Sequence, residues 1–67
     1  MNYSILIKEL RDKLIMSQTE LAEILGVSYT TISRWELGIH EPTIKAKRKI
    51  VELCLENNID TEKYRGN

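Results

Sequence analysis

The sequence is poor in the features that would settle its class at once. Its single cysteine, Cys54, leaves no internal disulfide, and no cluster of cysteine and histidine offers a zinc site. Ten lysine and arginine residues balance ten aspartate and glutamate residues. The net charge is therefore zero, which excludes a strongly basic tail or a polyanionic linker. No apolar run approaches the ~18–20 residues that span a membrane.

The length and composition fit one small domain. Sixty-seven residues, 42% of them hydrophobic and 30% charged, predict a single globular unit over residues 1–67. A domain of this size without disulfide or metal is held by packing alone, so well-capped helices or a partner chain are expected. The first residues lack the basic start, apolar run and cleavage site of a secretion signal, and we expect a cytoplasmic protein.

Apolar residues recur with a helical period along most of the chain, and no strand-like alternation interrupts them. We expect helices over about residues 4–15, between the cap Ser17 and Gly26, between the cap Ser28 and Gly38, and over about residues 44–56. Residues 60–67 form a polar tail that we expect to be frayed. The predicted fold class is therefore all-α.

The two short middle helices, over about residues 18–37, fit a helix-turn-helix. The helices of this motif cross steeply, so the residue at the crossing must be small, and Ala22 is. The turn needs a positive φ, which Gly26 adopts at little cost. The inward positions must be apolar, and they are Leu21, Leu25, Val27, Ile32 and Trp35. A four-helix domain with a tight turn and no DNA role remains the alternative.

The segments QTELAEILGVS (residues 18–28) and ISRWELG (residues 32–38), followed by Pro42, closely resemble the phage repressor/Cro (XRE-like) helix-turn-helix family. The resemblance covers about residues 5–56 and implies a compact four- to five-helix lambda-repressor-like domain. It also implies a sequence-specific DNA-binding transcriptional regulator of a phage or mobile element. We expect a repressor that binds a palindromic double-stranded operator as a homodimer. Leu37 departs from the family pattern, because asparagine is frequent at that position.

One arc of the third helix is suited to a DNA major groove. Ile32 and Trp35 point inward, and the opposite arc carries hydroxyl groups, Arg34 and Leu37. An arginine can bind guanine O6 and N7 together, and hydroxyl groups can reach base edges or phosphates. Gln18 and Ser28 stand at helix N-termini, where free N–H groups favour phosphate. With the resemblance, the candidate DNA-binding residues are Gln18, Ser28, Tyr29, Thr30, Ser33, Arg34, His40 and Lys45. Each side chain also has an ordinary alternative as a solvated surface group.

The fourth predicted helix has its charges in an unusual order. Its first turns hold Lys45, Lys47, Arg48 and Lys49, and its end holds Glu52 and Glu56. The helix dipole favours the reverse order. Residues 27–51 hold five bases and two acids, whereas residues 52–62 hold four acids and no base. DNA phosphate would explain the bases, and a solvated charged face is the alternative.

Two charged residues border the predicted core. Arg11 lies at the edge of the first apolar stripe and Glu36 lies beside Trp35. The family resemblance pairs these positions, and we expect a structural ion pair between the first and third helices. Two surface charges that never meet are the alternative.

Four further apolar residues exceed the obvious needs of the core: Leu37, Ile39, Leu53 and Ile59. If they were exposed together, the loop after the third helix and the end of the fourth would form a dimer patch. Alternatively, Leu53 and Ile59 cover the core of the single chain.

No grouping of side chains indicates catalysis. We find no catalytic triad, no paired carboxylates and no phosphate-binding glycine loop, so an enzyme, a metal site and a cofactor are not expected. Cys54 is interpreted as a small core residue. The main rival function is a protein-interaction module, such as an antitoxin or anti-repressor partner with the same fold. A third possibility is a DNA-binding domain of a longer regulator.

Overall fold

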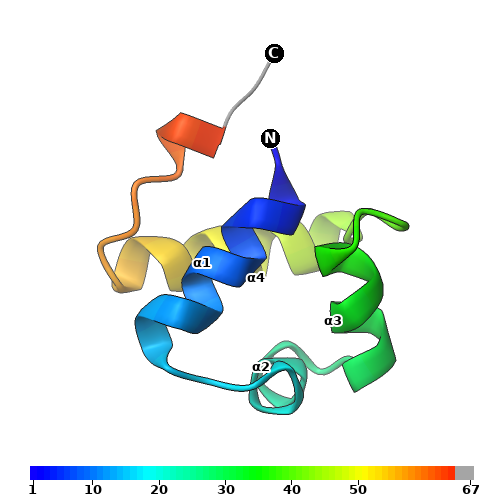
Figure 1. Ribbon diagram of the computed structural model, residues 1–67. Coiled ribbons are helices and arrows are strands. Elements are labelled where there is room, and N and C mark those ends of the chain that lie inside the picture. The colour runs from blue at the N-terminus through cyan, green and yellow to red at the C-terminus, as the bar shows by residue number, and fades with distance from the viewer. Residues whose placement is uncertain (65–67) are drawn as a thin grey trace.

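The computed structural model describes residues 1–64 and contains, in that part of the chain, four α-helices and one short 3-10 helix (Figure 1). They are α1 (Tyr3–Leu14), α2 (Gln18–Leu25), α3 (Tyr29–Glu36), α4 (Ile44–Glu56) and η1 (Glu62–Tyr64). No strand occurs over residues 1–64. The predicted all-α fold is confirmed, and the bounds of the helices differ from the predicted ones by a residue or two.

Each α-helix begins at a side-chain cap. Asn2, Ser17, Ser28 and Thr43 accept hydrogen bonds from backbone N–H groups in the first turns of α1, α2, α3 and α4. At Ser17 the capping box is complete, because Glu20 also accepts a hydrogen bond from the Ser17 backbone N–H at 2.8 Å. These local signals set where the helices begin, which is why the sequence pattern located them closely.

Each α-helix is also followed by a residue with a left-handed backbone: Ile15, Gly26, Gly38 and Asn58. At α2 the Val27 N–H then reaches back to the Ala22 carbonyl at 2.9 Å, and at α4 the Ile59 N–H reaches the Cys54 carbonyl at 2.8 Å. These are the hydrogen bonds of a Schellman motif, which reverses the chain and satisfies carbonyls at the helix end. Ile15 is unusual at such a position, because a β-branched side chain is strained there.

The core lies where the four helices meet. In Figure 1, α1 crosses in front of α4, α2 lies below them and α3 lies at the right. The residues with almost no exposed side chain are Leu6, Ile7, Leu10, Leu21, Ile32, Ile50 and Cys54. α3 is therefore held by its inner face, and its outer face is left open.

The C-terminal segment differs from the frayed tail that the sequence predicted. Ile59 is 3% exposed, because the turn at Asn58 directs it into the core, so of its two predicted roles it takes the one that covers the core. The short helix η1, within the segment expected to be frayed, contacts α1. The Asn2 N–H donates to the Tyr64 carbonyl at 2.7 Å, and the Tyr64 hydroxyl donates to the Glu9 carboxylate, which also pairs with Lys63. The remainder of the predicted tail, residues 65–67, lies outside the described residues.

Candidate nucleic-acid interface

α3 presents an outer face that is free of protein packing. Ile32 and Trp35 are buried, whereas Tyr29, Thr30 and Arg34 are exposed and Ser33 is half-buried. The two arcs of the helix therefore lie as the sequence predicted. An arginine flanked by hydroxyl groups on one helix face offers hydrogen-bond donors and acceptors of the kind that base edges match.

Ser28 already has hydrogen-bond partners within the chain. Its hydroxyl accepts from the Thr31 N–H at 3.1 Å and shares a second hydrogen bond with the Thr31 hydroxyl at 2.9 Å. The side chain is exposed but its first task is to cap α3. Any contribution of this position to anion binding would come largely from the backbone N–H groups of the first turn.

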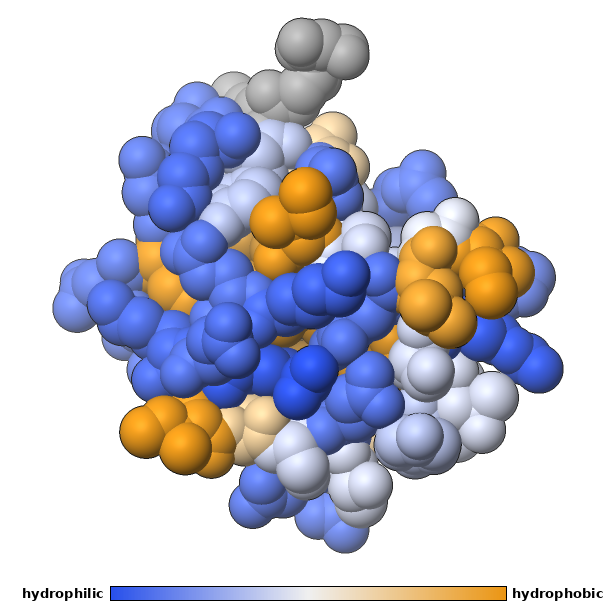
Figure 2. Space-filling view, viewed as in Figure 1, coloured by the Kyte–Doolittle hydropathy of each residue, from blue (hydrophilic) through white to orange (hydrophobic). Residues whose placement is uncertain are grey.

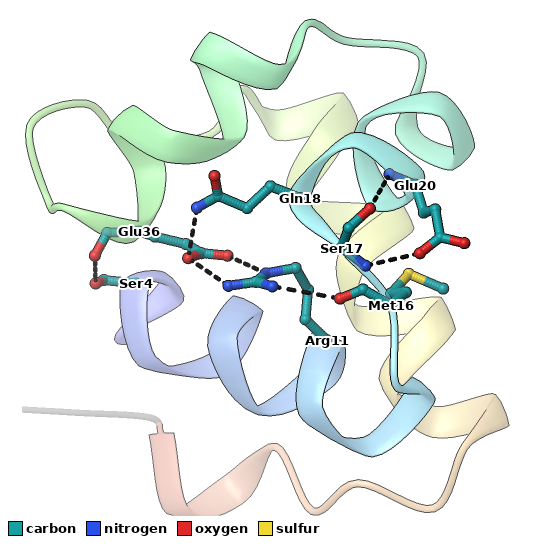
Figure 3. Close-up of polar contacts among 7 residues, drawn as sticks. All are labelled: Ser4, Arg11, Met16, Ser17, Gln18, Glu20 and Glu36. Carbon is teal, nitrogen blue, oxygen red and sulfur yellow. Dashed lines mark hydrogen bonds and ion pairs between the residues drawn. The ribbon is translucent and has the colours of Figure 1, made fainter.

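Arg11 and Glu36 meet between α1 and α3 in a two-point ion pair (Figure 3). Arg11 Nε donates to Glu36 Oε2 at 2.6 Å and Nη2 donates to Oε1 at 3.0 Å. Arg11 Nη1 also donates to the Met16 carbonyl at 3.3 Å, and the Ser4 hydroxyl donates to the Glu36 carbonyl at 2.5 Å. Glu36 is only 6% exposed. Its carboxylate holds the last turn of α1 through Arg11, and its carbonyl holds the first turn of α1 through Ser4.

Gln18 joins this network, which the sequence did not indicate. Its Nε2 donates to Glu36 Oε1 at 2.9 Å, so the first residue of α2 is held by the last residue of α3. The helix N-terminus and the family resemblance predict a DNA contact for Gln18, but neither predicts this bond. No spacing in the sequence reports that the start of α2 and the end of α3 lie together, because this contact depends on how the helices cross.

The network changes the acid–base behaviour of both charged groups. Burial alone would raise the pKa of Glu36, but hydrogen bonds from Arg11 and Gln18 and the charges of Arg11 and Lys8 outweigh it and lower the pKa. The hydrogen bond to Glu36 raises the pKa of Arg11. Both groups are therefore charged at neutral pH.

The basic side chains of α4 have unlike surroundings. Lys47 pairs with Glu41 at 3.3 Å and lies over the Tyr3 ring, with 5.2 Å from Nζ to the ring centre. Lys45 is exposed, as is His40 in the preceding loop. None of Lys45, Arg48 and Lys49 forms an ion pair with another residue of the described part of the chain.

The predicted dimer patch is not assembled. Leu37 and Ile39 are 70% and 62% exposed, and Figure 2 shows apolar side chains over the end of α3 and the following loop. Ile59 is buried, however, and Leu53 is half-buried against the core. Leu53 and Ile59 therefore cover the core of the single chain, which is the alternative that the sequence left open.

The side chains that commonly bind metals do not cluster within residues 1–64. No group of three or more histidine, cysteine, aspartate or glutamate side chains is placed to hold a metal ion there. Burial, with a smaller effect of the Glu9 charge, raises the pKa of Cys54 to about 11, so its thiol is protonated at neutral pH. No helix within this part of the chain is long and apolar enough to cross a membrane.

Comparison with known proteins gives one family. A helix-turn-helix family model matches residues 7–54, a stretch that contains α2, α3, the Arg11–Glu36 pair and most of α4. No curated protein and no solved structure matches the chain. The match spans well over half of the sequence and agrees with the order of the helices. The chain belongs to the XRE-like helix-turn-helix family of DNA-binding regulators.

Proposed function

We propose that the protein is a sequence-specific transcriptional repressor that reads the DNA major groove with α3. The observation that carries this proposal is the outer face of α3, where Arg34 and Thr30 are exposed and Tyr29 is 55% exposed, while the opposite face is buried. A recognition helix must present polar side chains without using them to hold the fold.

Within this proposal each side chain has a chemical role. Arg34 binds guanine O6 and N7, and the Thr30 methyl group lies against a thymine methyl group. Tyr29 and Ser33 offer hydroxyl groups to neighbouring base edges. Phosphates on either side of the groove are bound at the helix N-termini marked by Gln18 and Ser28 and by the exposed side chains of His40 and Lys45.

The operator is a palindrome bound by two protomers. One eight-residue helix contacts few base pairs, and the zero net charge gives little long-range attraction to DNA. Pairing two protomers about a two-fold axis doubles the specific contacts and places the recognition helices about 34 Å apart, one helical turn of DNA.

Selection of bound sequences from a random DNA pool tests the proposal. We expect an enriched motif with two inverted half-sites, bound more weakly as salt rises because phosphate contacts release counterions. Recovery of no motif, with binding to all sequences alike or to none, would contradict sequence-specific recognition.

The exposed Leu37 and Ile39 favour one second candidate, a protein-interaction module with the same fold, such as an antitoxin. The two candidates differ in the effect of Leu37→Ser combined with Ile39→Ser. An interaction module loses its protein partner in this variant, whereas a DNA-binding regulator keeps its preference among DNA sequences. An adjacent toxin gene would also favour the module.

A further inference from the structure

α4 carries an apolar stripe that no residue of the described part of the chain covers. Ile44 is 68% exposed, Leu55 is 63% exposed, and Val51 between them is half-buried. With Arg48 these positions follow the spacing i, i+4, i+7 and i+11, which places them on one side of a helix. The opposite side of α4 is used by Ala46, Ile50 and Cys54 to close the core. Beside the stripe lies a shallow hollow of about 420 Å³ against Tyr3.

One flank of this stripe divides into a basic half and an acidic half. At about 100° per residue, four side chains fall on the same flank, about 80–140° from Ile44. They are Lys45, Lys49, Glu52 and Glu56, and all four are exposed. None of them forms an ion pair within residues 1–64.

This order of charges is unfavourable for an isolated helix. Lys45 lies four residues from Lys49, and Glu52 lies four residues from Glu56, so like charges are neighbours in both halves. The bases also stand at the positive end of the helix dipole and the acids at the negative end. Residues 1–64 offer this flank no ion pair that would compensate for the order of its charges.

We propose that this face of α4 binds the same face of a second copy, with the two α4 helices antiparallel about a two-fold axis. In an antiparallel pair the start of one helix meets the end of the other. Ile44 then packs against Leu55 of the second copy, and Lys49 meets Glu52 of the second copy. The two-fold axis repeats each contact, so Lys49 of each copy meets Glu52 of the other, and Lys45 at the start of the helix keeps the phosphate contact of the proposed function.

The arrangement of the charges selects this partner. DNA phosphates would compensate the lysines but would repel Glu52 and Glu56 and leave Ile44 and Leu55 in water. In a parallel pair the two-fold axis would turn this flank toward the opposite flank of the second copy, where Lys47 already pairs with Glu41. The antiparallel copy covers the apolar stripe, sets Lys49 against Glu52 and opposes the two helix dipoles.

The inference deepens the proposed function, because it assigns the dimer that a palindromic operator requires to α4 rather than to the loop around Leu37. Its biological role rests on that function, but the contact itself does not involve DNA. One stripe on a 13-residue helix makes a small interface. We therefore expect a weak dimer that loses stability as salt screens its charge pairs.

Sedimentation of the full chain without DNA, at low ionic strength, tests the pairing through charge reversal. The variants Lys49→Glu and Glu52→Lys each place like charges across the two-fold axis, and each should weaken self-association by about tenfold or more. Mixed in equal amounts they should form a heterodimer, because the acid introduced at position 49 of one chain then faces the base introduced at position 52 of the other. Lys13→Glu and Glu23→Lys make the same charge changes at exposed sites on α1 and α2 and should leave self-association unchanged.

The outcomes separate the possibilities. Loss in both single variants with recovery in the mixture supports the antiparallel α4 pair, and Leu55→Ser should weaken it without loss of helical circular dichroism. A wild-type chain that stays monomeric at high concentration, or a mixture that does not recover, would overturn it. If the mixture recovers self-association but the wild-type chain selects no DNA motif, the α4 pair stands and the proposed function is contradicted instead.

Discussion

Gln18 donates its side-chain N–H to Glu36 Oε1 over 2.9 Å, so the first residue of α2 is held by the last residue of α3. The same carboxylate binds the Arg11 guanidinium at two points. One buried acid therefore fixes the relative position of the two helices of the helix-turn-helix. Such a link fixes α2 and α3 relative to each other before any ligand is bound.

Replacement of this carboxylate should destabilise the fold in a pH-dependent manner. Because the folded state lowers the pKa of Glu36, its contribution is complete above the pKa of the unfolded state, about 4.3, and is lost as pH falls through the folded-state value. Glu36→Gln should thus lower the free energy of unfolding at pH 7, and its difference from the wild type should shrink as pH falls below about 4.3. Urea unfolding followed by circular dichroism measures both. A difference that stays constant over this pH range would show that the charge is unimportant.

Replacing Ile15 by glycine should stabilise the fold. It has φ 52° and is 90% exposed, so its β-branched side chain bears the strain of a left-handed backbone and gains almost no burial. The left-handed conformation costs roughly 1–2 kcal/mol, part of which the flexibility of unfolded glycine offsets. We expect Ile15→Gly to raise the free energy of unfolding by about 0.5–1 kcal/mol. Ile15→Ala keeps the Cβ atom and should give no such gain. Thermal unfolding of both variants and the wild type measures the difference.

Two isoleucines that resemble each other in the sequence should respond very differently to truncation. Ile59 is 3% exposed and Ile39 is 62% exposed. Ile59→Ala leaves a cavity beneath the C-terminal segment and should cost about 2–5 kcal/mol. Ile39→Ala should change the free energy of unfolding by less than about 0.5 kcal/mol. Equal effects in denaturant titrations would mean that the segment after α4 does not cover the core.

The parts of the fold that depend on neighbours in sequence could be predicted. The caps Ser17 and Ser28, the turn at Gly26 and the inward face of α3 all follow from side chains a few residues apart. For the same reason the outward position of Arg34 was correctly predicted. At each of these positions the helical period and the local caps predict the same helix.

The parts that depend on the crossing of helices could not be predicted. Ile59 follows α4 as a single apolar residue without a period, and only the left-handed turn at Asn58 brings it back to the core. The bond between Gln18 and Glu36 likewise joins two different helices across a turn, so no period within one helix relates the two residues.

The net charge of zero is consistent with this account, since the charges of α4 can compensate each other across a pair of molecules rather than within one. Under the proposed function, affinity for DNA then depends on local contacts, namely base contacts of α3 and the few phosphate contacts beside it.

The most direct test of the central claim is the base preference of Arg34→Ala, measured by the same random-pool selection as the wild type. Arg34 makes no ion pair within residues 1–64 and is exposed, so the fold should survive the change. We predict that the variant still selects a two-part motif but loses preference at one base pair of each half-site, at a cost of ~1–3 kcal/mol. Lys13→Ala, at an exposed position on α1, serves as the control and should select the wild-type motif. An unchanged motif and unchanged affinity for Arg34→Ala would contradict the reading of DNA by the outer face of α3.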